Sequence, residues 1–130
     1  MSSENRSFID ELQKIEAAKI EATDRAVAGL ETLVATIRRN PTAGQTRRLV
    51  RFLAGIYNGP RFPFDLTDLR GLDLNLAQAC LDVLALDHFG IREIHQWGPV
   101  DDVELNKWIV DEGLYYEAQK RRIAGELYEH

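Results

Sequence analysis

Arginine side chains stand out among the residues of this sequence whose types and spacing could carry chemistry. Six arginines fall between Arg38 and Phe64, a stretch that contains no acidic residue. A guanidinium group donates two parallel hydrogen bonds to a carboxylate or a phosphate, so this stretch could bind an acidic protein surface or nucleic acid. The candidate partner-binding residues are Arg47, Arg48, Arg51, Asn58 and Arg61.

The following stretch has the opposite charge. Between Asp65 and Glu104, nine acidic residues are accompanied by only two arginines. Three interpretations of the arginine stretch are therefore open: pairing with this acidic stretch in the same fold, contact with a protein partner, or contact with nucleic acid. We prefer them in that order, since a formal net charge of -5 opposes general affinity for nucleic acid.

Other chemistry-bearing residues lack the spacing that a catalytic or metal site requires. Asp65, Asp68 and Asp73 do not have the spacing of a calcium loop, and His88 and His95 do not form a zinc-binding register. The sequence contains no glycine-rich phosphate loop and no nucleophile elbow. We expect no metal, no cofactor and no enzymatic activity.

The single cysteine, Cys80, lies in an apolar run and has no lysine or arginine within eight residues to stabilise a thiolate. We therefore expect a buried thiol without a chemical role.

Apolar spacing and helix-breaking residues predict that the elements carrying these residues are helical. Proline and glycine at Pro41, Gly59, Pro60, Gly90 and Gly98 separate the apolar-periodic segments. The expected helices and shorter helical pieces cover residues 7–39, 43–57, 65–72, 74–88, 101–112 and 114–128, and residues 91–97 form a short helical or extended piece. This pattern predicts an all-α fold, a small orthogonal or bundle-like helical domain with a long N-terminal helix.

The long first helix has two different halves. Its second half has the better apolar spacing and is expected to pack on the domain. Its first half projects, pairs with a second copy, or is a partly frayed helical N-terminus. We divide the chain into residues 1–40, a docked or dimerising helix, and residues 41–130, a compact helical domain. Helix 74–88 is expected at the centre, with Asp73 as its cap, and Val103 is expected to point inward with Leu105, Trp108 and Ile109.

The N-terminal residues contain no apolar stretch of signal-peptide length, and no segment approaches the ~20 apolar residues that span a bilayer. We expect a cytoplasmic protein that does not enter a membrane.

The stretch from Gly44 to about Asp111 carries a family resemblance. Its residues are Gly44-Gln45-Thr46-Arg47-Arg48, Phe52-Leu53, Tyr57-Asn58 and above all Phe64-Asp65-Leu66-Thr67-Asp68-Leu69, followed by Asp73. This stretch resembles a family of uncharacterised proteobacterial proteins often encoded on plasmids and integrative elements. The resemblance implies a bacterial accessory gene and no established activity.

These observations favour a non-enzymatic interaction or adaptor module with a protein partner, including a second copy of itself. It would use the arginine face, the loop from Asn58 to Phe64 and the N-terminal helix. One alternative is a nucleic-acid-binding regulator that uses Arg47, Arg48 and Arg51. Another is an inhibitor of a defence complex whose acidic stretch mimics nucleic acid, which rests on the mobile-element analogy alone.

Overall fold

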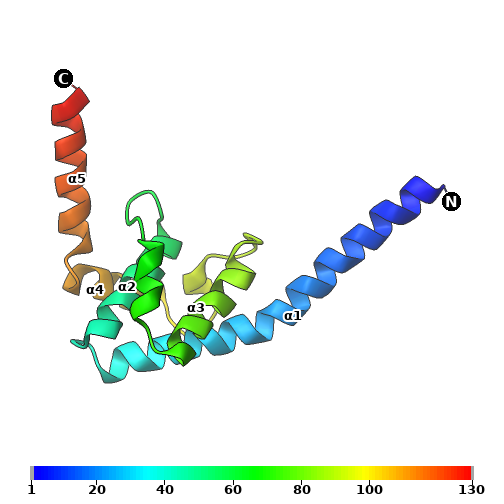
Figure 1. Ribbon diagram of the computed structural model, residues 1–130, viewed down its shortest axis with the longest axis horizontal. Helices are drawn as coiled ribbons and strands as arrows, with labels where there is room; N and C mark the ends of the chain where they lie inside the picture. The colour runs from blue at the N-terminus through cyan, green and yellow to red at the C-terminus, as the bar shows by residue number, and fades with distance from the viewer. Residues whose placement is uncertain (1, 130) are drawn as a thin grey trace.

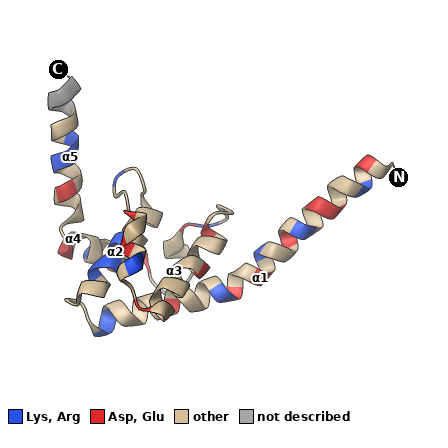
Figure 2. Cartoon of the chain, in the orientation of Figure 1, with Lys and Arg blue, Asp and Glu red and all other residues tan. Residues whose placement is uncertain are grey.

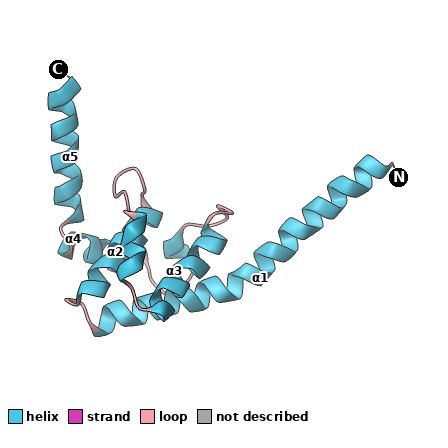
Figure 3. Cartoon of the chain, viewed as in Figure 1, coloured by secondary structure: helices cyan, strands magenta, loops and turns pink. Residues whose placement is uncertain are grey.

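The computed structural model describes residues 2–129, with side chains described up to residue 125. Five α-helices and two short 3₁₀ turns make up this part of the chain, and it contains no β-strand (Figures 1 and 3). The predicted all-α fold with a long N-terminal helix is confirmed. The elements are α1 (Ser3–Arg39), α2 (Gly44–Tyr57), η1 (Leu66–Gly71), α3 (Leu74–Asp87), η2 (Ile94–Gln96), α4 (Asp102–Asp111) and α5 (Leu114–Glu129).

Helix α1 is 37 residues long and begins earlier than the sequence predicts. The Ser2 hydroxyl accepts a hydrogen bond from the backbone N–H of Asn5, which caps the first turn. The helix ends at Arg39, with Asn40 as its C-cap, because a residue before proline, here Pro41, disfavours the helical conformation. Its second half runs along the core, and its first half extends away from the rest of the molecule (Figure 1).

The second half of α1 packs against α3 through small residues. Ala22, Ala26 and Gly29 are buried there, and a Cβ atom on Gly29 would lie 2.9 Å from the carbonyl oxygen of Ala79. The absence of large side chains lets the two helix backbones approach closely, as in other helix pairs with short interaxial distances. This contact anchors α1, as its apolar spacing predicts.

The hydrophobic core lies where α1, α2, α3 and α4 meet. Its fully buried side chains include Leu30, Leu33, Leu49, Leu53, Val83, Ile94, Leu105 and Ile109. Phe62, from the loop after α2, is also buried and holds that loop against the core.

One local expectation is wrong, and a second holds for the position of the residue but not for its hydrogen bond. Val103 is 75% exposed, because the buried face of the ten-residue helix α4 is occupied by Leu105 and Ile109 instead. Asp73 is the N-cap residue of α3, as expected, but its side chain makes no capping hydrogen bond; its carboxylate instead accepts a hydrogen bond of 3.1 Å from Gln45 Nε2. Local patterns do not distinguish a cap from a contact between segments.

Helix α5 follows α4 after a turn at Gly113, where a φ of 77° requires glycine. It then leads away from the core to the C-terminal end of the chain (Figure 1). None of the helices in the described part of the chain is long and apolar enough to cross a membrane.

Candidate functional site

The predicted arginine face of α2 is engaged with the corner between α4 and α5. Arg51 donates two hydrogen bonds to Glu117, of 2.8 and 3.1 Å, and its Nε lies 3.4 Å from Glu112. Arg47 Nε donates to the same Glu112 carboxylate at 3.3 Å. These ion pairs hold the start of α5 against α2. Figure 2 shows basic residues on α2 and acidic residues near the start of α5. The hydrogen bonds from Arg51 also lower the pKa of Glu117 below its ordinary value and raise the pKa of Arg51.

The acidic partners are not the ones that the charge pattern suggests. Glu112 and Glu117 both follow the acidic stretch that ends at Glu104. Within that stretch, Glu104 accepts hydrogen bonds of 2.6 and 3.0 Å from Arg38, which lies near the end of α1. These hydrogen bonds lower the pKa of Glu104. Charge counts along a sequence therefore predict the existence of internal pairing but not its partners.

The third arginine of this face has a different neighbour. The Arg48 guanidinium lies against Gly71, where an added Cβ would be only 2.6 Å from its Cζ atom. The three arginines predicted to form one partner surface are thus divided between two internal contacts.

Asn58 and Arg61 lie together at the start of the loop after α2. The Asn58 side-chain oxygen accepts a hydrogen bond of 3.2 Å from the backbone N–H of Arg61. The Arg61 guanidinium lies 4.6 Å from the ring centre of Tyr115, in cation–π contact, and the Tyr115 ring meets Phe62 edge to face. The loop therefore brings Arg61, next to Asn58, into contact with α5.

This contact forms one wall of an open groove of about 870 Å³ between the loop and α5. Among the residues whose side chains are described, its lining combines basic, aromatic and amide groups: Pro60, Arg61, Tyr115, Tyr116, Ala118, Gln119, Arg121 and Arg122. Sequence reasoning missed the groove, although the signal was present in the run Lys120-Arg121-Arg122 that follows the two tyrosines. We refer to it below as the Arg61 groove.

A hydrogen-bond network fixes the aromatic wall of the groove. The Tyr115 hydroxyl donates a short hydrogen bond to the Asn106 side-chain oxygen, and Asn106 Nδ2 donates to Tyr57 at 3.1 Å. These residues come from α5, α4 and α2 respectively, so the network joins three helices below the groove.

A second candidate surface is the projecting first half of α1. Phe8, Leu12 and Ile15 lie three or four residues apart, so their side chains share one face of the helix. They are 66%, 47% and 40% exposed. An exposed apolar stripe of this kind is typical of a contact with another helix. We refer to these three residues as the arm stripe.

Cys80 and the histidine and acidic side chains are the other chemistry-bearing residues of the sequence. Cys80 is fully buried, and burial raises the pKa of its thiol to about 12. Among the described residues, no group of three or more histidine, cysteine or acidic side chains could hold a metal ion.

The comparison with protein families matches residues 27–111 to a family of unknown function, DUF7673. The match covers more than half of the chain, and the protein belongs to this family. It runs from Val27 in α1 to the end of α4, so the arm stripe and α5 lie outside it. No curated protein and no solved structure matches the chain.

Proposed function

We propose that this protein is a non-enzymatic protein-interaction module that makes its contact through the arm stripe of α1. One observation carries this proposal: a single helix is covered along its second half and bare along its first half. Phe8, Leu12 and Ile15 continue the same helix face on which Ala22 and Ala26 are buried against the core. A helix of this length in water is stabilised mainly by burying such a face.

The register of the stripe supports pairing with one further helix. The residues follow alternating steps of four and three along α1, in the order Phe8, Leu12, Ile15, Lys19, Ala22, Ala26, Gly29 and Leu33. This is the heptad spacing of a coiled-coil seam, in which each apolar side chain fits between side chains of a facing helix. In the C-terminal part of this seam, the facing helix is α3, which ends near Ala22.

The charges beside the stripe favour a second copy of the chain in antiparallel orientation as the partner. In a parallel pair, Glu11 would face Glu16 of the other copy and Lys19 would face its own equivalent across the seam. An antiparallel pair that aligns Leu12 with Ile15 of the other copy places Phe8 against Lys19. The apolar stem of Lys19 can then cover the ring while its ammonium group reaches water.

The same antiparallel alignment places Glu11 opposite Ala18 and Glu16 opposite Ile9, so no two acids oppose each other. The arms of the two copies would then cover each other as α3 covers the second half of α1.

Sedimentation velocity tests this proposal through the mass of the particle in solution. The wild-type protein should sediment as a dimer of 14.8 kDa chains at micromolar concentration. Leu12→Glu should give a monomer whose core stays folded, since Leu12 lies outside the core. Ile20→Glu is the matched control, because Ile20 is 72% exposed on the same arm but off the stripe. A wild-type monomer at ~100 μM would refute self-association.

Disulfide formation tests the orientation. Cys80 is buried, so a cysteine introduced in place of Asn5 is the only accessible thiol among the described residues. In a parallel pair the two introduced cysteines face each other and oxidise to a disulfide. In the antiparallel pair they lie about 26 Å apart along the axis, beyond the reach of a disulfide. Rapid cross-linking of Asn5→Cys would therefore contradict the antiparallel arrangement.

The alternative of nucleic-acid binding through Arg47, Arg48 and Arg51 has less support, because two of these arginines are held by Glu112 and Glu117. Three further points stay proposals: the origin in a bacterial mobile element, a role as an adaptor within it, and the inhibition of a defence complex. They rest on the family resemblance, and genes adjacent to family members would test the first of them.

A further inference from the structure

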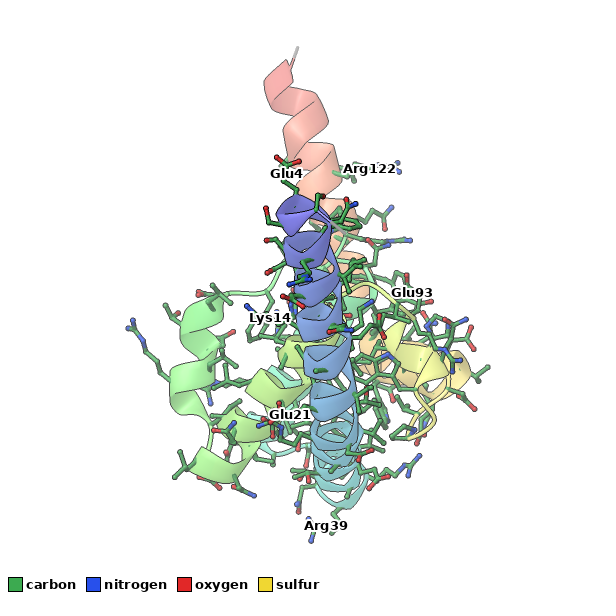
Figure 4. The ribbon with its side chains drawn as sticks, turned by 90° about the vertical axis from the view of Figure 1, so that its right-hand side faces the viewer. Glu4, Lys14, Glu21, Arg39, Glu93 and Arg122 are labelled. Carbon is green, nitrogen blue, oxygen red and sulfur yellow. The ribbon has the colours of Figure 1, made fainter. Side chains whose placement is uncertain are left out.

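The first turns of α5 cover a surface that includes Arg51 of α2. The family match ends at Asp111, so the covered surface lies inside the matched residues and the cover lies outside them. Leu114 is buried in this contact, and Tyr115 packs beside it. Helix α5 leads away from the domain in both views (Figures 1 and 4), so its beginning makes the contact. We refer to residues 114–118 as the latch.

The Arg51 guanidinium binds two carboxylates through different atoms. Its Nε lies 3.4 Å from Glu112, whereas Nη1 and Nη2 donate to Glu117 at 3.1 and 2.8 Å. Glu112 is the C-cap of α4, lies before Gly113 and also contacts Arg47, so it is not part of the latch. When the latch lifts at Gly113, the terminal edge of the guanidinium therefore loses its carboxylate while Nε keeps its own.

Two further groups lose a partner when the latch lifts. The Phe62 ring meets Tyr115 edge to face, with ring centres 5.1 Å apart, and the Asn106 side-chain oxygen accepts a hydrogen bond from the Tyr115 hydroxyl. The surface under the latch thus offers a bidentate donor, an aromatic ring and an amide acceptor. A helical segment that presents a carboxylate and an aromatic side chain matches these groups.

Gly113 provides the hinge on which the latch can lift as a unit. Only Glu112 and Gly113 separate α4 from α5, and Gly113 has a φ of 77°. A change of this residue to helical dihedral angles would join the two helices into one and carry Tyr115 off Phe62. A Cβ added to Gly113 would have no described atom within 4 Å, so the positive φ, and not crowding, requires glycine there.

We infer that Arg51, Phe62 and Asn106 form a docking site for a helical segment of a partner protein, and that the latch is an autoinhibitory cover of this site. We refer to these three residues as the Arg51 site. The side chains of Arg51 and Glu117 are 36% and 39% exposed, and exposed ion pairs of this kind contribute little to stability. A segment held in this way can open locally while the rest of the domain stays folded.

Fluorescence anisotropy with a labelled peptide that copies residues 113–124 tests the inference on the full chain. The latch competes with the peptide for the Arg51 site, so opening the latch should strengthen binding. Gly113→Ala should bind the peptide about tenfold more tightly than the wild type does, because alanine disfavours the positive φ of the closed hinge. Gly90→Ala is the matched control, since Gly90 has a φ of 66° and also lacks a described neighbour. It should bind as the wild type does.

A second pair of variants opens the latch through its ion pair. Glu117→Ala should strengthen peptide binding about threefold, as expected for an exposed pair. Its control is Glu104→Ala, which removes the carboxylate that accepts two hydrogen bonds from Arg38 elsewhere and should leave the affinity unchanged. Adding Arg51→Ala to Gly113→Ala should abolish the gain. This pair supplies the same comparison if Gly113→Ala does not fold.

All variants are made in the Leu12→Glu background, so that the arm stripe does not contribute and the two proposals fail independently. Equal affinities of the opened variants and their controls would overturn the inference, as would absence of peptide binding to Gly113→Ala at ~100 μM protein. A dimer of Gly113→Ala in this background would show that α5 of a second copy fills the Arg51 site. That result would replace the partner protein and likewise contradict the inference.

Discussion

Replacing Gly29 with alanine should destabilise this protein, although Gly29 lies inside α1, where alanine is the better helix former. Helix propensity alone would stabilise the variant by about 1 kcal/mol. However, the new Cβ would lie 2.9 Å from the Ala79 carbonyl oxygen and 3.3 Å from the Asp82 Cβ atom. The first distance is about half an ångström short of an ordinary contact, and a backbone oxygen cannot move aside without shifting α3.

The expected size follows from the balance of these two effects. Overpacking a close contact costs about 1–3 kcal/mol, which exceeds the gain in helix propensity. The net loss in the free energy of unfolding should be about 1 kcal/mol, which lowers the melting temperature by about 4 °C for a chain of this size. Urea unfolding followed by circular dichroism measures it directly.

The control for this prediction is Gly125→Ala. Gly125 lies in α5, and a Cβ added there has no other atom within 4 Å. That variant should be as stable as the wild type or slightly more stable. If Gly29→Ala proved more stable than the wild type, α1 and α3 would be less closely packed than the structure indicates, and the argument from backbone contact would be refuted.

Three further predictions concern ionisation, reactivity and the hydrogen-bond network. Because Arg51 lowers the pKa of Glu117, the ionised pair stabilises the fold above the ordinary carboxyl pKa near ~4.3, and this contribution is lost as the pH falls through the lower native pKa. At pH 7 the free energy of unfolding of the wild type should therefore exceed that of Glu117→Gln by less than about 1 kcal/mol. A difference of the same size at pH 2, measured by urea unfolding, would contradict the role of the ionised pair. Cys80, with a thiol pKa of about 12, should react with Ellman's reagent at pH 8 only after denaturation, and prompt native labelling would show that it is accessible. Asn106→Ala should lower the free energy of unfolding by about 1–3 kcal/mol, since the part-buried Tyr115 hydroxyl loses its hydrogen-bond acceptor. An unchanged melting temperature would show that water replaces the Asn106 side chain as acceptor.

Much of the local structure of this protein could be predicted from the sequence. Helix boundaries follow from Pro41, Gly59, Gly90 and Gly113, because proline and glycine act on the backbone of their own neighbours. The difference between the two halves of α1 and the burial of Cys80 are also confirmed, since both depend on apolar spacing within one helix.

The partners of polar and aromatic side chains were decided only by the tertiary structure. Arg51 meets Glu117, which is 66 residues away in sequence, and Arg61 lies over Tyr115. Helical periodicity indicates which face of a helix is polar, but which faces meet depends on loop paths and on how closely two helices approach. That approach is set between α1 and α3 by the missing side chain of Gly29, so the positions of the arm stripe and the Arg61 groove follow from packing that no local pattern specifies.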